Sequence, residues 1–169
     1  MKNKLIIFDL DGVLINSINN MKYALLSTEK KMNIKLNFND YKKYLGLPFD
    51  DIMGKMKIKV DVNQIKKNYE DFSKKKISEI KIDKNILIGL KLLKKNYKLA
   101  VFTSKSRNRT LNILKKYNFF KYIVTSDDIK KGKPNPEGLI KIISRLKVKK
   151  TNTIFVGDSL YDYQASKLA

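Results

Sequence analysis

The chain has 169 residues, of which 43% are apolar, enough for one globular domain with a buried core and a small insertion. It contains no cysteine and no histidine, which excludes disulfides, thiolate zinc sites, cysteine nucleophiles and a histidine general base. The net charge of +21 favours anionic partners without choosing among nucleic acid, membrane surfaces and phosphorylated metabolites. Any catalysis must therefore rely on carboxylates, hydroxyls, lysines and a hard metal ion.

The sequence gives no sign of a membrane segment. No stretch approaches the roughly 18 consecutive apolar residues of a spanning helix, and the N-terminus turns acidic too early for a secretory signal. We therefore expect a cytoplasmic protein without a membrane partner. The positive residues are almost all lysines spread along nearly every helical stretch, which predicts a solvated surface and argues against nucleic acid as a partner.

The first element in chain order is the apolar run Leu5–Phe8, which predicts a buried strand. Residues 16–80 then contain helix-like segments and no comparable apolar run, so we interpret them as an inserted helical subdomain. Its expected helices are Ser17–Met32, Asp40–Leu45, Asp50–Met56 and Asn63–Ser78. Gly46-Leu47-Pro48 predicts a turn between the second and third of these helices.

Residues 81–169 are expected to complete the core together with residues 1–15, through short connectors near Ile15 and Lys81. A helix at Asn85–Lys95 leads back into this core. The next elements are the strand Leu99–Phe102, the helix Arg107–Tyr117, the strand Tyr122–Val124, the helix Glu137–Lys147 and the strand Thr153–Val156. Their alternation predicts an α/β fold with a parallel sheet, and the wholly apolar strands are expected to be buried on both faces.

Small or acidic polar residues follow three of these strands at once. They are Asp9-Leu10-Asp11-Gly12, Thr103-Ser104 and Gly157-Asp158-Ser159. Ligands of open parallel sheets bind beyond the carboxyl ends of the strands. The sequence therefore predicts a site along one edge of the sheet that contains Asp9, Asp11, Thr103, Ser104 and Asp158.

The two carboxylates of Asp9 and Asp11 suit phosphoryl transfer. One can attack phosphorus while the other protonates the leaving group and later activates water. A carboxylate that approaches a phosphate dianion needs a divalent cation and positive donors nearby. Asp158 can supply an oxygen ligand to Mg²⁺, and Lys133 can supply a compact positive charge.

Each of these features also has a purely structural interpretation when it is taken alone. An isolated Asp-x-Asp more often caps a helix or faces water, and Thr103-Ser104 could cap the following helix. Lys133 could be a surface residue of a proline-containing turn. Asp158 and Asp162 could simply favour the positive end of a helix dipole.

In combination, the motifs resemble those of haloacid dehalogenase-like hydrolases, in the branch that contains phosphoglycolate phosphatases and beta-phosphoglucomutases. The resemblance rests on Asp9-x-Asp11-Gly12-Val13, the strand ending in Thr103, Gly132-Lys133-Pro134, and Gly157-Asp158-x-x-x-Asp162, in that order. It implies a Rossmann-like parallel sheet core, residues 1–15 and 81–169, with an inserted α-helical cap, residues 16–80.

The resemblance also implies roles for individual residues. Asp9 would be the nucleophile and a metal ligand, and Asp11 the acid/base whose carbonyl binds Mg²⁺. Thr103, the Ser104 backbone and Lys133 would bind phosphate. Asp158 would complete the protein ligands to Mg²⁺, and Asp162 would orient Lys133 or a metal-bound water.

Three positions depart from the family pattern. Val13 replaces a common threonine, and Asn16 replaces a common aspartate at the connector to the cap. Family members also usually continue past the helix that ends at Ala169, so we expect that the chain lacks a C-terminal part of the fold. Such a loss would expose apolar side chains on a neighbouring strand.

The resulting prediction is a magnesium-dependent phosphatase that hydrolyses a small phosphorylated metabolite, phosphoglycolate-like or sugar-phosphate-like, through an aspartyl-phosphate. Gly46–Phe49 is the expected cap loop at the substrate. Asp11 argues against a dehalogenase, which needs no acid/base at that position. A phosphosugar mutase, and a basic domain that binds nucleic acid or an acidic partner without catalysis, are the alternatives.

Overall fold

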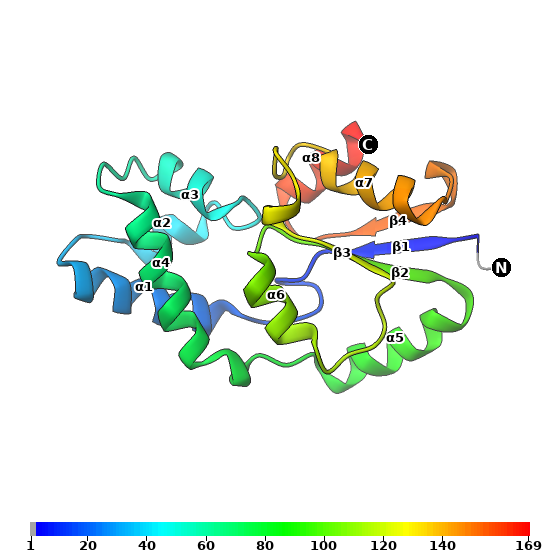
Figure 1. Ribbon diagram of the computed structural model, residues 1–169, viewed down its shortest axis with the longest axis horizontal. Helices are drawn as coiled ribbons and strands as arrows, with labels where there is room; N and C mark the ends of the chain where they lie inside the picture. The colour runs from blue at the N-terminus through cyan, green and yellow to red at the C-terminus, as the bar shows by residue number, and fades with distance from the viewer. Residues whose placement is uncertain (1–2) are drawn as a thin grey trace.

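The computed structural model describes residues 3–169 and has an α/β fold (Figure 1). Four parallel strands form its sheet: β1 (Leu5–Phe8), β2 (Lys98–Phe102), β3 (Tyr122–Val124) and β4 (Thr153–Val156). Their spatial order is β3-β2-β1-β4, so β1 lies between β2 and β4. The expected α/β fold with a parallel sheet is confirmed.

Eight α-helices accompany the sheet within the described residues. They are α1 (Ile18–Met32), α2 (Phe38–Lys42), α3 (Phe49–Lys55), α4 (Val62–Lys75), α5 (Lys84–Asn96), α6 (Arg107–Leu114), α7 (Glu137–Leu146) and α8 (Leu160–Leu168). Three short 3₁₀ turns are η1 (Ile77–Glu79), η2 (Ser126–Asp128) and η3 (Lys150–Asn152). None of the helices within residues 3–169 is long and apolar enough to cross a membrane.

The side chains of β1 point alternately into two apolar clusters, one on each face of the sheet. Ile6 and Phe8 face the cluster that contains Leu90 of α5 and Ile113 of α6. Leu5 and Ile7 face the cluster that α7 and α8 complete. This alternation follows from the two-residue period of a strand. The sheet is therefore held between α5 and α6 on one face and α7 and α8 on the other, as Figure 1 shows.

Helices α1–α4 form a separate cluster beyond the carboxyl ends of the strands (Figure 1). It has its own apolar core, in which Leu25 of α1 and Ile65 of α4 are fully buried. The segments that enter and leave it meet where Ile15 pairs with Ile82 in an isolated antiparallel bridge. The assignment of residues 16–80 to a cap domain stays a prediction.

Two expectations about the elements are wrong. Strand β4 is not buried on both faces: Ile154 is 55% and Val156 37% exposed, because β4 lies at the sheet edge and α5 and α6 cover only the other strands on that side. Three helices end three residues earlier than predicted: α2 at Lys42, α4 at Lys75 and α6 at Leu114. Tyr117, which follows α6, accepts a hydrogen bond from the Ile82 amide through its hydroxyl at 3.3 Å.

Capping residues explain why two helices begin earlier than predicted. The Asn37 side chain accepts hydrogen bonds from the amides of Asn39 and Asp40, so α2 begins at Phe38. The Asp61 side chain accepts hydrogen bonds from the amides of Asn63 and Gln64, so α4 begins at Val62. An N-cap of this kind satisfies amides that have no partner inside the helix.

Asp128 closes a capping box at η2, where its Oδ2 accepts hydrogen bonds from the Thr125 amide and hydroxyl at 2.9 and 2.7 Å. Burial alone would raise the pKa of Asp128, but these bonds and the charge of Arg107 outweigh it and lower the pKa below its ordinary value of 3.8. We expect Asp128→Asn to reduce the free energy of unfolding by about 1 kcal/mol at neutral pH. The pKa of Asp128 is lower in the native state than in the unfolded state. The carboxylate therefore contributes fully to stability above its unfolded pKa, and this contribution is lost as the pH falls through its native pKa. Urea titrations of both proteins should therefore converge in acid, and a gap that persists there would contradict this prediction.

Candidate active site

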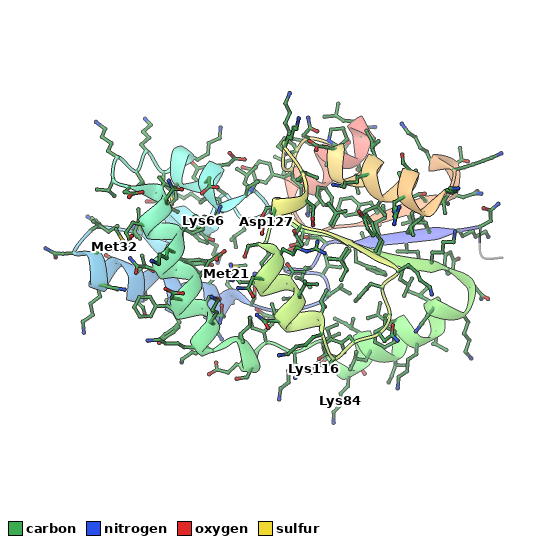
Figure 2. The ribbon with its side chains drawn as sticks, in the orientation of Figure 1. Met21, Met32, Lys66, Lys84, Lys116 and Asp127 are labelled. Atoms are coloured by element: carbon green, nitrogen blue, oxygen red, sulfur yellow. The ribbon has the colours of Figure 1, made fainter. Side chains whose placement is uncertain are left out.

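A cavity of about 350 Å³ lies between the carboxyl ends of the strands and the helical cluster. Five of the predicted site residues line it: Asp9, Asp11, Thr103, Ser104 and Asp158. The predicted loop Gly46–Phe49 forms part of its wall on the helical side. Figure 2 shows Lys66 of α4 and Asp127 of η2, which also line the cavity, on either side of this space. The sheet and the helical cluster thus both contribute to one site.

Asp9 comes directly after β1 and is only 4% exposed. Its Oδ1 lies 2.8 Å from Nζ of Lys133, and the same Nζ lies 2.6 Å from Oδ1 of Asp162. Burial raises the pKa of Asp9 to about 7, although the charge of Lys133 opposes this shift. The three side chains form a buried row that starts with Asp9 at the cavity wall and has the positive charge of Lys133 between the two carboxyl groups.

Lys133 is fully buried, so its interpretation as a surface residue of a turn is wrong. Burial by itself would lower the pKa of Lys133, but the charges of Asp9 and Asp162 outweigh it and raise the pKa. The ammonium group therefore stays protonated at neutral pH. It offsets the negative charge of Asp9 at the point where a phosphate would approach.

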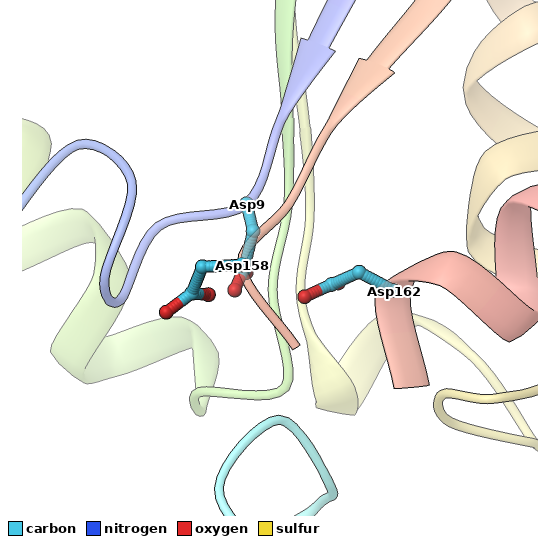
Figure 3. Close-up of side chains that lie close together, drawn as sticks. All are labelled: Asp9, Asp158 and Asp162. Carbon is cyan, nitrogen blue, oxygen red and sulfur yellow. The ribbon is translucent and has the colours of Figure 1, made fainter. Parts of the chain in front are cut away.

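Asp9, Asp158 and Asp162 form an acidic cluster, shown in Figure 3, in which carboxylate oxygens lie within 4.8 Å of one another. Asp162 is already engaged: Oδ1 pairs with Lys133, and Oδ2 accepts hydrogen bonds from the Ser159 amide and hydroxyl at 3.1 and 2.5 Å. Asp9 and Asp158 retain oxygen atoms that face the cavity. Carboxylate oxygens are the ligands that Mg²⁺ and Ca²⁺ prefer.

Gly12 makes room for Asp158. Its φ of +80° is one that side chains rarely tolerate, and a Cβ atom at this position would collide with the Asp158 carboxylate. Burial, followed by the charge of Asp162, raises the pKa of Asp158 above its ordinary value. The glycine of the Asp9-Leu10-Asp11-Gly12 turn therefore allows the first and last strands of the sheet to bring their acids together.

The carboxylate of Asp11 is held by two groups that were not predicted. The Ser17 hydroxyl donates to its Oδ1, and Nζ of Lys105 lies 3.1 Å from the same oxygen. Ser17 occupies the N-cap position of α1 without capping the helix through its side chain. Burial, and next the charge of Arg109, lower the pKa of Lys105 to about 8. Both contacts fix Asp11 beside Asp9 at the cavity.

Thr103 and Ser104 do not cap α6. The Thr103 hydroxyl accepts a hydrogen bond from the Lys105 amide at 3.2 Å, and the Ser104 hydroxyl donates to the Gly46 carbonyl at 2.6 Å. Gly46 has a φ of +104°, and a Cβ there would press against Ser159. On the same loop, Pro48 lies against Gly132 of the core. The loop is thus closed onto the strand ends and limits access to the cavity.

The sequence pattern of a family described as haloacid dehalogenase-like hydrolase matches residues 6–169. The chain belongs to the haloacid dehalogenase-like hydrolases. The resemblance drawn from the four motifs is thereby confirmed. Membership in this hydrolase family also supports the expectation of an enzyme, a phosphatase.

Two named relatives and one solved structure are similar to this chain. Pyrophosphatase PpaX of Halalkalibacterium halodurans is 30% identical over 100% of this chain and 81% of its own length. Pyrophosphatase PpaX of Bacillus mycoides is 30% identical over 96% of this chain and 78% of its own length. Among solved structures, CbbY from Rhodobacter sphaeroides in complex with phosphate has a TM-score of 0.85, with 17% identity over 98% of this chain and 82% of that one. The last likeness shows the fold alone.

Burial picks out three cations at this site, of which the sequence had singled out only Lys133. The chain has 37 lysines and arginines, and within residues 3–169 the buried ones are Lys105, Arg109 and Lys133. All three lie at this site. The available signal was that Lys105 directly follows Thr103-Ser104 at a strand end, but abundant lysine elsewhere masks it. Lys84 and Lys116, which extend outward in Figure 2, are examples of that background.

Proposed function

We propose that this hydrolase is a magnesium-dependent phosphatase that hydrolyses a small phosphate monoester through an aspartyl-phosphate on Asp9. The observation that carries the proposal is the position of Asp9, which faces the cavity with Lys133 behind it and Asp11 and Asp158 beside it. The pyrophosphatase names of the relatives support a phosphorylated substrate. A volume of about 350 Å³ suits a small molecule.

The residues present fit a divalent cation. Asp9 and Asp158 would hold it through carboxylate oxygens. The resemblance to the family adds the backbone carbonyl of Asp11 as a third ligand. When bound, Mg²⁺ would supply positive charge to the phosphoryl oxygens. Asp162 would keep its place as the partner of Lys133.

In the first step, a carboxylate oxygen of Asp9 forms a bond to phosphorus while the bond from phosphorus to the leaving oxygen breaks. Asp11, in its protonated form, donates its proton to the leaving oxygen. Lys133 holds the attacking carboxylate in place from the buried side. Thr103 and Ser104 line the cavity, and the Thr103 hydroxyl and the Ser104 amide would donate to phosphoryl oxygens.

In the second step, the Asp11 carboxylate accepts a proton from water as the water oxygen attacks phosphorus. The bond between phosphorus and Asp9 breaks, which releases inorganic phosphate and restores the Asp9 carboxylate. Ser17 and Lys105 keep Asp11 aimed at the cavity in both steps. The loop Gly46–Phe49 keeps bulk water away from the reacting groups.

Hydrolysis of an aryl phosphate with added Mg²⁺, and again with excess chelator, tests this function. We expect turnover only with Mg²⁺ and one inorganic phosphate released per ester consumed. Absence of turnover at every Mg²⁺ concentration would count against a phosphatase. Conversion of a sugar phosphate to its isomer without release of phosphate would favour a mutase instead.

Metal binding can also be measured without turnover. A cation at 100 times its dissociation constant stabilises a one-site protein by about 2.7 kcal/mol, which for a chain of this size raises the melting temperature by roughly 5–10 °C. We expect Mg²⁺ to have this effect on the wild type and to raise the melting temperature of Asp158→Asn by less than about 2 °C. The control Asp51→Asn removes a carboxylate from the same cavity but outside the cluster. An equal rise in all three proteins would contradict Asp158 as a ligand.

A further inference from the structure

Arg109 is a buried cation that faces the cavity without an acidic partner. It lies on α6, is only 6% exposed and forms part of the cavity wall. Among residues 3–169, no carboxylate oxygen lies within ion-pair distance of its guanidinium group. Its Nη2 is buried and has no hydrogen-bond partner in that part of the chain.

The neighbours of Arg109 hold it in place without neutralising it. Its Nε donates to the Ser73 hydroxyl at 3.1 Å, and its guanidinium lies 5.0 Å from the centre of the Tyr69 ring. Ser73 in turn donates to Asn20 at 2.6 Å. These partners belong to α4 and α1 of the helical cluster, whereas Arg109 belongs to the core. The side chain is therefore fixed at the seam between the two parts, with donors left over.

A permanently charged guanidinium that is buried without a counter-charge is costly. The charge of Asp11 also acts on Arg109, but the Asp11 carboxylate is paired with Lys105 and forms no ion pair with the guanidinium. Arg109 is thus left without an ion-pair partner of its own in the wall of the proposed phosphatase site. An anionic group of a ligand would remove this cost and use the free donors.

The position of Arg109 indicates which part of the ligand it meets. Lys133, Asp9 and Asp158 surround the place of the phosphoryl group at the strand ends. Arg109 lies instead against Tyr69 of the helical cluster, on the side of the cavity toward which the leaving group must extend. The cavity of about 350 Å³ limits the distance between the two groups of one ligand.

We infer that Arg109 binds a second anionic group, a carboxylate or a phosphate, on the leaving-group side of the scissile bond. The inference rests on the proposed phosphatase function and narrows its substrates to compact phosphate compounds with two anionic ends. Arg109 then acts as a specificity-determining residue. A purely structural role between α6 and α4 would instead affect all substrates equally.

Matched substrate pairs separate these two roles. Phosphoglycolate and 2-hydroxyethyl phosphate differ by a carboxylate, and pyrophosphate and methyl phosphate differ by a second phosphate. For each pair, the measured quantity is kcat/KM for the compound with two anionic groups divided by kcat/KM for its match. We expect Arg109→Met to lower this ratio in at least one pair by about 10- to 100-fold, the effect of one charge-assisted contact. The pair that responds identifies the anion. Arg109→Lys should lose less, because it keeps the charge but not the planar fork.

Arg107→Met is the control, since Arg107 lies on the same helix, is exposed, and pairs with Asp128 outside the cavity. Its ratios should equal those of the wild type. Unchanged ratios in folded Arg109→Met would overturn the inference. If that variant does not fold, a wild type that prefers neither phosphoglycolate nor pyrophosphate over its match with a single anionic group would overturn it as well.

A binding measurement keeps this test separate from the fate of the proposed function. Calorimetric titration of phosphoglycolate and pyrophosphate is made into Asp9→Asn, with and without Arg109→Met. We expect the second change to weaken binding of at least one of them by about 10- to 100-fold. Equal affinities would overturn the role of Arg109. A wild type that hydrolyses none of the four compounds would refute the phosphatase, while these affinities would still decide whether Arg109 binds an anion.

Discussion

Asp9→Asn is expected to abolish hydrolysis of phosphate monoesters, with a loss of about four to six orders of magnitude in kcat. The amide keeps the shape of the carboxylate but cannot act as the nucleophile that forms an acyl phosphate. Initial rates with an aryl phosphate at saturating Mg²⁺ measure the effect. Because the residue is buried against Lys133, no other carboxylate in the described residues occupies the same place.

The control for Asp9→Asn is Asp51→Asn, which removes one negative charge from an exposed residue of the same cavity. Its rate should stay within about threefold of the wild type. A second measurement addresses the intermediate directly: wild type quenched during turnover should carry one phosphoryl group on the peptide that contains Asp9. Turnover by Asp9→Asn within tenfold of the wild type, or label on another peptide, would contradict the assignment of the nucleophile.

The sheet and its helices could be predicted because their signals are local. The runs Leu5–Phe8 and Thr153–Val156 coincide with β1 and β4, and the amphipathic spacing from Glu137 onward coincides with α7 apart from its last residue. The site at the carboxyl ends followed from the same local facts, since parallel strands end on one edge. The prediction that β4 is buried on both faces was wrong, because a run of apolar residues does not say which neighbours cover a strand.

Lys105 and Arg109 were not predicted, because their burial depends on contacts between distant parts of the chain. Arg109 is buried because α4 packs over it, and Ser73 lies 36 residues away in sequence. In the same way, the Ser104 hydroxyl bonds to Gly46 across 58 residues. In a chain with 37 basic residues, composition cannot separate such positions from a solvated surface. Only the tertiary packing shows that these side chains have lost their access to water.

Lys133→Met is expected to lower the free energy of unfolding by about 3–5 kcal/mol, the cost of a buried ion pair that loses one partner. The change leaves Asp9 and Asp162 buried together with no positive charge between them. Chemical denaturation in urea measures the loss. Turnover should fall as well, because the Asp9 carboxylate would lose the charge that favours its ionised form.

The effect of Lys133→Met on stability should depend on pH. Burial already raises the pKa of Asp9 to about 7, and removal of Lys133 raises it further. A carboxyl group whose pKa is raised on folding destabilises the native state more as the pH rises, so the loss should be larger near pH 8 than near pH 5.5. Adding Asp162→Asn removes one of the two orphaned charges and should restore part of the stability, whereas Lys131→Met, at an exposed neighbour, should change it by less than about 0.5 kcal/mol. Equal losses at both pH values, or no recovery in the double variant, would show that Lys133 supports the fold through its packing and not through its charge.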